Sequence, residues 1–142
     1  MLTVYPACFF KEDNGYSVIF PDLDWLSTCG KDLNEALEKS IDCLASHIYT
    51  CEKMNMTIAA PSNVSDVNIK EIETALEISS EDAFVNMISV DVKAYAKENF
   101  EKSVKKTLSI PLWLNTIALE QGINFSQVLQ EALYNKIKNN LT

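Results

Sequence analysis

Three carboxylates are the first residues of this chain that could do chemistry. Asp22, Asp24 and Asp91 could converge and hold metal ions, as the carboxylates of two-metal nucleases do. However, Asp22 follows Pro21 in a Pro-Asp turn, where aspartate is favoured because its side chain bonds to the nearby backbone. Asp91 lies at a position of a predicted strand whose side chain points away from the core. Contact with solvent is enough to explain a carboxylate at this position. We therefore expect no metal and no catalysis.

Thiols and imidazoles offer no alternative active site. The four cysteines stand at positions 8, 29, 43 and 51 without a CxxC pair. Cys43 and Cys51 lie eight residues apart among apolar neighbours, which favours buried, reduced thiols over disulfides or zinc ligands. His47 is the only histidine, so one chain cannot build a histidine-based triad or a multi-histidine metal site. We find no phosphate loop or cofactor motif in residues 1–92 and expect no cofactor.

Hydrogen-bonding side chains recur near residue 105 at a spacing that orients them together. Lys105, Thr107 and Ser109 alternate with Leu108 and Ile110, which predicts a half-buried strand over residues 104–110. A single strand is not stable without a partner, and the helices predicted next to it cannot supply ladder hydrogen bonds. The simplest solution is an antiparallel pair formed with a second copy of the chain.

Two short helices are predicted to follow this strand. Pro111 suits the first position of a helix, and Gly122 suits a left-handed C-terminal cap. Asn124 can then cap a second helix, with Gln127 completing a capping box. The second helix has an apolar stripe of Phe125, Val128, Leu129, Ala132, Leu133 and Ile137.

The order of one strand, a proline and two helices resembles the Arc/MetJ-type ribbon-helix-helix family. The resemblance implies a dimer that places Lys105, Thr107 and Ser109 in the DNA major groove. It also implies that the backbone N–H groups of Phe125 and Ser126 bind a phosphate. The dimer core would comprise Leu108, Ile110, Leu114, Ile117, Val128 and Leu129. The alternative is a helical hairpin that only packs on the preceding domain.

Length and composition set the frame for the rest of the chain. Its 142 residues fit one medium domain, or a domain of about 100 residues with a small appendage. The hydrophobic fraction of 47% is ample for a core. We see no apolar run of the ~18 residues that a membrane span needs and no basic-then-apolar leader, so we expect a cytoplasmic protein that does not bind membranes.

Charge is divided unevenly along the chain. Residues 1–100 hold 7 lysines against 17 carboxylates, a net charge of −10, and residues 101–142 hold 5 lysines against 3, a net charge of +2. The basic tail suits DNA and the acidic body suits a cationic partner, although acidic surfaces also serve solubility alone. The chain contains no arginine, so the bidentate guanine contact that arginine makes is not available.

The N-terminal part reads as an antiparallel sheet with one long helix. Residues 2–10, 16–20 and 25–29 are strand-like, and Asn14-Gly15 marks a hairpin turn. Asp32 can cap a helix that runs to about Met54. Residues 61–82 suggest a weakly structured insert, in which residues 70–78 could form a helical turn or two because Ile72, Ala75 and Leu76 share a face. Residues 83–92 read as a further strand, and residues 93–103 as a linker that could include a short helix. We thus predict an α+β fold with domains at residues 1–92 and 104–142.

Several short motifs in this part resemble the HicB antitoxin family. They are Gly15-Tyr16, Phe20-Pro21-Asp22-Leu23, Thr28-Cys29-Gly30, Glu35-Ala36 and Ala60-Pro61-Ser62. The resemblance implies a partial ribonuclease-H-like domain without nuclease activity, which neutralises HicA, a small basic mRNA-cleaving toxin. It also implies a tail that represses its own operon. One departure is Asp24-Trp25-Leu26, which stands where the family often has Pro-Gly-Cys.

Candidate toxin contacts combine apolar anchors with charges at the rim. We predict Tyr16, Phe20 and Trp25 as anchors, with Asp22 and Asp24 beside them. The alternative is that all three aromatic residues are sheet core. A different functional hypothesis is a stand-alone ribbon-helix-helix repressor whose N-terminal domain senses a small molecule. Assembly beyond the dimer, including higher-order complexes with toxin, stays open.

Overall fold

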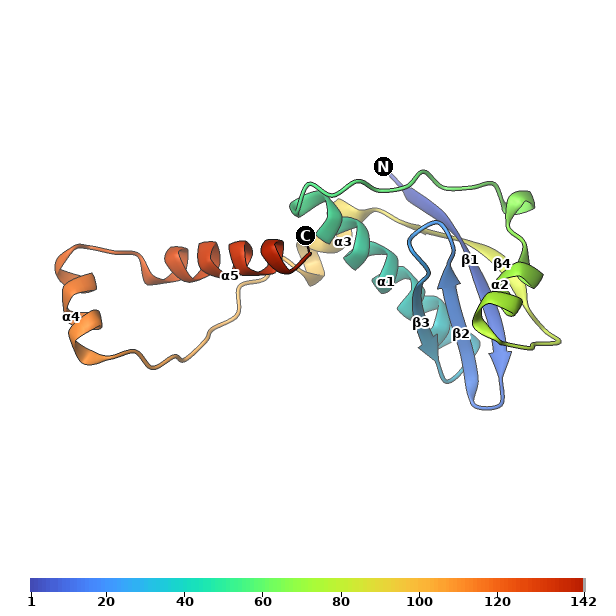
Figure 1. Cartoon of the computed structure of the whole chain (residues 1–142), viewed down its shortest axis with the longest axis horizontal. Helices are drawn as coiled ribbons and strands as arrows, with labels where there is room; N and C mark the ends of the chain where they lie inside the picture. Colours follow the sequence, from blue (N-terminus) through green and yellow to red (C-terminus); the bar gives the residue numbers. More distant parts are fainter. Residues whose placement is uncertain (142) are drawn as a thin grey trace. The chain divides into compact units, whose positions relative to one another are not determined.

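The computed structural model describes residues 1–141 and separates the chain into two compact units, one of residues 1–102 and one that begins at Ser103 (Figure 1). The first unit holds a four-stranded antiparallel sheet in the order β3-β2-β1-β4. The strands are β1 (Thr3–Glu12), β2 (Gly15–Phe20), β3 (Leu26–Gly30) and β4 (Phe84–Val90). The helices of this unit are α1 (Leu33–Lys53), α2 (Ile69–Leu76) and α3 (Val92–Asn99). The α+β class and the antiparallel sheet are confirmed.

Strand β1 lies in the centre of the sheet even though it contains a proline. Its pairing with β2 begins only at Cys8, whereas its pairing with β4 runs from Thr3 to Phe9 and sets Pro6 opposite Met87. Proline has no N–H and is tolerated in a sheet where no ladder bond is required of it. Pro6 precedes the β2 pairing, so its missing donor costs no ladder bond on that side.

Helix α1 covers one face of the sheet and closes the main core. Phe9, Phe20 and Leu44 are fully buried there, and the burial of each such side chain stabilises the fold by about 1.5–3 kcal/mol. The predicted cap is confirmed, because the Glu35 N–H donates to Asp32 Oδ1 at 2.8 Å. The Glu35 carboxylate in turn accepts a bond from the Lys31 N–H.

Two glycines allow the β1–β2 hairpin, the end of β3 and the start of α1 to meet. A Cβ at Gly30 would lie 2.3 Å from the backbone nitrogen of Ala36. A Cβ at Gly15, where φ is +141°, would lie 2.1 Å from the carbonyl oxygen of Gly30. Both distances are shorter than those that real Cβ atoms make. The backbones can therefore approach this closely only because glycine occupies positions 15 and 30.

The segment at residues 61–82 is more ordered than the sequence suggested. It contains a short 3-10 helix, η1 (Val64–Asp66), and then α2, which Asn68 caps by accepting a bond from the Glu71 N–H. Ile72 of α2 is buried against the second face of the sheet, with Cys8, Phe10 and Ile19. The helical turn expected over residues 70–78 is confirmed as α2, whereas the prediction of a weakly structured insert was wrong, because this short helix is ordered by contacts with distant strands.

Residues 93–102 belong to the first unit and do not form a simple linker. The Tyr95 hydroxyl of α3 donates to Asp42 of α1 at 3.0 Å. The Phe100 ring lies 5.5 Å from the ring of Tyr49 and 5.6 Å from that of Tyr95. Asp91 caps α3 through the Ala94 N–H. These contacts extend the first unit ten residues beyond the predicted boundary.

The second unit contains α4 (Leu112–Glu120) and α5 (Phe125–Leu141). Gly122 takes the predicted left-handed conformation at φ +64°, and the Ile123 N–H reaches back to the Ala118 carbonyl, which completes a Schellman motif. Pro111 is the N-cap and not the first helical residue. Asn124 accepts a bond from the Gln127 N–H as expected, but the Gln127 side chain bonds to Glu131, so the capping box is not closed.

Residues 103–110 form neither helix nor strand in the single chain. No backbone partner for them exists among residues 1–141, so the strand predicted over residues 104–110 is not formed within one copy of the chain. Within the same residues, no helix combines the length and apolar character needed to cross a bilayer.

Candidate functional site

An apolar groove runs along the second unit. Its walls come from the extended segment, α4 and α5, and they include Leu108, Ile110, Leu114, Val128 and Leu129. These are five of the six residues predicted for a dimer core; the sixth, Ile117, lies outside the groove lining and is also exposed. Only Ala118 of the described residues in this unit is buried. A 40-residue unit with so little core requires a partner surface for stability.

The extended segment presents two different faces. Lys106, Leu108 and Ile110 line the groove, whereas Lys105, Thr107 and Ser109 are exposed and do not line it. The alternation expected from the sequence is therefore present in the backbone. It leaves the three predicted DNA-contacting side chains clear of the groove.

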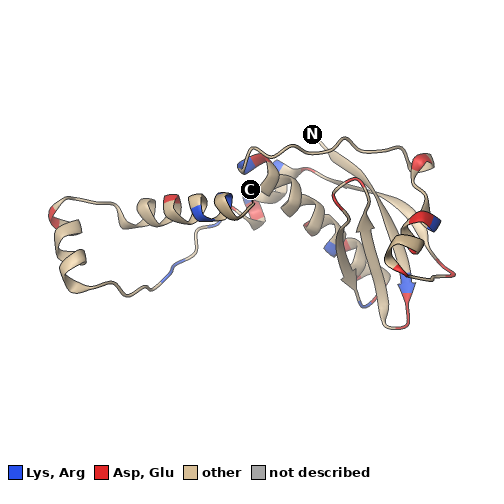
Figure 2. Ribbon diagram, in the orientation of Figure 1, with Lys and Arg blue, Asp and Glu red and all other residues tan. Residues whose placement is uncertain are grey.

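The N-terminus of α5 is open to an anion. The N–H groups of Phe125 and Ser126 have no acceptor within residues 1–141. Unpaired N–H groups and the helix dipole together favour negative charge at such a terminus. The surrounding unit is mildly basic, with four lysines against two carboxylates (Figure 2).

Two of the predicted toxin contacts are excluded or restricted by burial. Phe20 is 0% exposed in the main core, so it cannot contact a partner of the folded domain. Tyr16 is half-buried and packs against the same core. Asp22 uses both carboxylate oxygens internally: Oδ2 accepts the Ser62 N–H at 2.8 Å and Oδ1 accepts the Ser62 hydroxyl at 2.7 Å. Asp22 therefore holds the segment after α1 in place, and its role as a rim charge stays a prediction.

Asp24 and Trp25 occupy a strained turn between β2 and β3. Their φ angles are +52° and +60°, and the Leu26 N–H donates to the Leu23 carbonyl at 3.0 Å, the arrangement of a type I′ turn. Such turns favour Asn-Gly, and a residue with a side chain pays about 1–2 kcal/mol in this conformation. Trp25 is nonetheless 42% exposed. It is the one predicted aromatic anchor that remains available.

Trp25 also borders a shallow hollow on the sheet face that α2 only partly covers. The other walls are Ser17, Ile19, Ser27, Thr28, Cys29, Leu76 and Ile78. Leu76 at the end of α2 is itself largely exposed, so the hollow has two apolar sides. Trp25 was predictable from the sequence but this hollow was not, because α2 and the β2–β3 turn lie about 50 residues apart.

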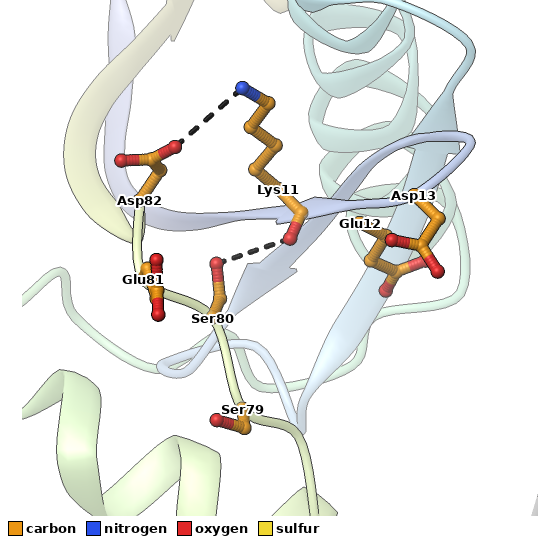
Figure 3. A pocket seen from close by; sticks show the side chains of 7 residues that line it. All are labelled: Lys11, Glu12, Asp13, Ser79, Ser80, Glu81 and Asp82. Carbon is orange, nitrogen blue, oxygen red and sulfur yellow. Dashed lines mark hydrogen bonds and ion pairs between the residues drawn. The ribbon is translucent and has the colours of Figure 1, made fainter.

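A second hollow is acidic. The tip of the β1–β2 hairpin and the loop before β4 bring together Lys11, Glu12, Asp13, Ser79, Ser80, Glu81 and Asp82, which we call the acidic hollow (Figure 3). The Lys11 ammonium lies 3.6 Å from Asp82, and the Ser80 hydroxyl donates to the Lys11 carbonyl. The lining of the acidic hollow thus includes one lysine and four carboxylates. No local sequence signal identifies this site, because its halves are about 70 residues apart.

Burial governs the chemistry of the thiols within residues 1–141. No group of three or more His, Cys, Asp or Glu residues within residues 1–141 could hold a metal ion. Burial raises the pKa of the Cys8 thiol to about 11, and the negative charge of Asp22 adds to this shift. Cys51 Sγ lies 3.6 Å from His47 Nε2, but burial raises the pKa of this thiol as well, which disfavours the reactive thiolate.

Comparison with known proteins identifies the family. A model described as "HicB_like antitoxin of bacterial toxin-antitoxin system" matches residues 5–131. The chain belongs to the HicB-like antitoxin family. Comparison of this HicB-like antitoxin with curated proteins gave no significant match.

Solved structures resemble this HicB-like antitoxin over most of its length. A chain of a toxin–antitoxin complex from Streptococcus pneumoniae is 31% identical, covers 96% of this chain and 99% of its own, and superposes with a TM-score of 0.64. The Burkholderia pseudomallei antitoxin HicB is 17% identical, with coverages of 96% and 98% and a TM-score of 0.49. A chain of a HicA3 and HicB3 toxin-antitoxin complex is 17% identical, with coverages of 60% and 94% and a TM-score of 0.48.

Proposed function

We propose that this antitoxin neutralises a HicA-like, cationic, mRNA-cleaving toxin through its first unit and represses its own operon through its second. In this proposal the first unit binds and blocks the toxin without chemistry of its own. The second unit pairs with a second copy and binds operator DNA. Two separate features of the molecule support the two halves of the proposal.

Charge and an exposed aromatic residue support toxin binding. The first unit carries eight lysines against eighteen carboxylates, a net charge of −10, which attracts a cationic protein and repels nucleic acid (Figure 2). Complementary charge accelerates encounter, while affinity comes mainly from desolvated apolar anchors. Trp25 is the best such anchor, because the fold keeps it exposed in a turn that glycine would occupy at lower cost. Asp24, exposed beside it, supplies the rim charge.

The unfilled apolar groove supports dimerisation and DNA binding. An antiparallel pair of the 104–110 segments would satisfy their ladder hydrogen bonds and cover Leu108 and Ile110 in one step. The same pairing would set Lys105, Thr107 and Ser109 from both chains side by side on the opposite face. A two-stranded ribbon of this kind fits the DNA major groove, and the open N-terminus of α5 would bind a flanking phosphate.

Toxin neutralisation is tested by co-expressing the full chain with the protein that the adjacent gene encodes. We expect a stable complex and rescue of growth when that protein is a cationic ribonuclease. Trp25→Ala should weaken the complex about tenfold or more, as hot-spot tryptophans do. Trp113→Ala, which removes the other tryptophan from the second unit, is the matched control. Equal affinity for both variants would show that the toxin binds to a surface without Trp25. Failure of the parent chain to bind would refute this half of the proposal.

Operator binding is tested on DNA from the chain's own promoter region. Lys105→Ala or Thr107→Ala should lower specific affinity by about 1–3 kcal/mol if the residue makes a good base contact. Lys106→Ala removes the same charge from the groove side and should have a smaller effect. Parent-like binding by the Lys105→Ala, Thr107→Ala double variant would exclude readout by this strand face.

A further inference from the structure

Strand β4 is left open along one side. It is the last strand in the order β3-β2-β1-β4 and pairs with β1 alone. Within residues 1–141, no further backbone bond reaches residues 84–90. An unpaired edge exposes a row of N–H and C=O groups to which another chain can add a strand.

The register with β1 identifies which groups of β4 point outward. Pro6 has no N–H and stands opposite Met87. The pairing of β1 with β2 begins two residues later at Cys8, whose backbone groups point to the same side of β1 as those of Pro6. Met87 therefore lies at a position where the β1 and β4 backbones do not exchange bonds. The same alternation directs the N–H and C=O groups of Val85 and Ser89 away from β1.

The residues of this edge carry none of the protections that sequence can supply, although the short helix η1 contacts β4. Natural sheets block open edges with lysine, proline, bulges or very short strands, or cover them with a helix or loop. Residues 84–90 read FVNMISV and include no charge and no proline over seven residues. Phe84 and Met87 keep 36% and 37% of their surface exposed, and Ser89 is exposed as well. The opposite edge, β3, is only five residues long and ends at Gly30 against the backbone of α1.

The acidic hollow lies at the start of this edge. The register places Phe84 opposite Phe9, two residues before Lys11, so the hollow adjoins the N-terminal end of β4 (Figure 3). Asp13 and Glu81 have no lysine partner there, since the one lysine of the hollow pairs with Asp82. A second copy of this chain would bring another −10 unit and another acidic hollow. A strand with basic neighbours would instead be attracted.

The geometry points to β4 as the place where a cationic protein partner adds a strand to the sheet, with its basic side chains beside the acidic hollow. This inference rests on the proposed function, because the partner is the cationic toxin. The added strand would bond to Val85, Met87 and Ser89 and would cover Phe84 and Met87. The contact through Trp25 lies at the β2–β3 turn and does not depend on it.

Amide exchange measured by NMR tests the backbone bonds directly. The probe is the cationic protein of the adjacent gene, bound to the full-length chain. In the free chain, the Val85, Met87 and Ser89 amides should exchange quickly and those of Asn86 and Ile88 slowly. In the complex all five should be slow. Unchanged fast exchange at Val85, Met87 and Ser89 in a saturated complex would overturn the inference.

A charge at the edge tests the same contact by affinity. Met87→Lys places an edge-blocking lysine on an exposed site and should weaken partner binding at least tenfold, with an unchanged melting temperature. Thr50→Lys on the exposed face of α1 makes the same charge change and should weaken binding less than threefold. Equal affinities would overturn strand addition and leave the proposed function intact. Failure of the parent chain to bind would refute the proposed function, and slow exchange of the free chain at high concentration would show self-pairing instead.

Discussion

Replacing Leu108 by alanine should dissociate the dimer proposed for the second unit. Leu108 lines the apolar groove and is 62% exposed in the single chain, so pairing would bury most of its remaining surface. Full burial of a leucine side chain is worth about 1.5–3 kcal/mol, of which roughly 1–2 kcal/mol is still to be gained here. The twofold axis places the change in both chains, which doubles the loss to about 2–3 kcal/mol per dimer after allowing for the methyl group that alanine keeps.

This loss corresponds to an increase of about 30- to 150-fold in the dimer dissociation constant. Sedimentation equilibrium over a range of concentrations measures the constant directly. Leu119→Ala is the matched control, because Leu119 is also 62% exposed, lies in α4 and does not line the groove. A Leu108→Ala chain that dimerises as tightly as the Leu119→Ala chain would refute the argument that this groove is the dimer interface. Retention of the dimer by a chain truncated after Lys102 would place the interface in the first unit.

Three further predictions concern the first unit. Gly30→Ala should destabilise it by about 2 kcal/mol or more in urea unfolding, since the new methyl group meets the α1 backbone at Ala36. Parent-like stability would show that β3 and α1 can move apart at little cost in free energy. Cys29, which is exposed, should react with a thiol reagent at pH 8 while Cys8 stays unreacted in the folded state, because burial raises the pKa of Cys8 to about 11. Hydrogen bonds from the α3 backbone and the N-terminal amine lower the pKa of Asp91, so its stabilising effect is present above the unfolded pKa and is lost as the pH falls through the folded one. Asp91→Asn should therefore lose stability at pH 7 and show a weaker acid dependence of the melting temperature than the parent.

Much of the local structure was predictable from residues close together in the chain. The hairpin at Asn14-Gly15, the Asp32 cap and the left-handed Gly122 each depend on a few neighbouring residues. The apolar period of α1 likewise requires only one helix to be read. The alternation at 104–110 correctly separated the groove side from the exposed side, because successive side chains of an extended segment point in opposite directions.

Other features were decided only by tertiary structure. The sequence could not distinguish Phe20, which is core, from Trp25, which is exposed, because both are aromatic residues next to the same turn. Whether each side chain is buried depends on which part of the sheet α1 and the segment after it cover. Asp22 likewise became a structural residue because Ser62, 40 positions later, returns to bond with it.

The same distinction explains the second face of the sheet, the extent of the first unit and the open edge. The apolar face of Ile72, Ala75 and Leu76 indicated a helical turn in α2, but the sequence could not show that Ile72 packs on strands far away in the chain and so orders the segment. Helix α3 joins the first unit because Tyr95 and Phe100 reach α1. Residues 84–90 are recognisable as a strand from their β-branched composition, but only the strand order makes them an edge. Local periodicity thus determined the elements of this protein, and long-range contacts determined which of their surfaces remain available to a partner.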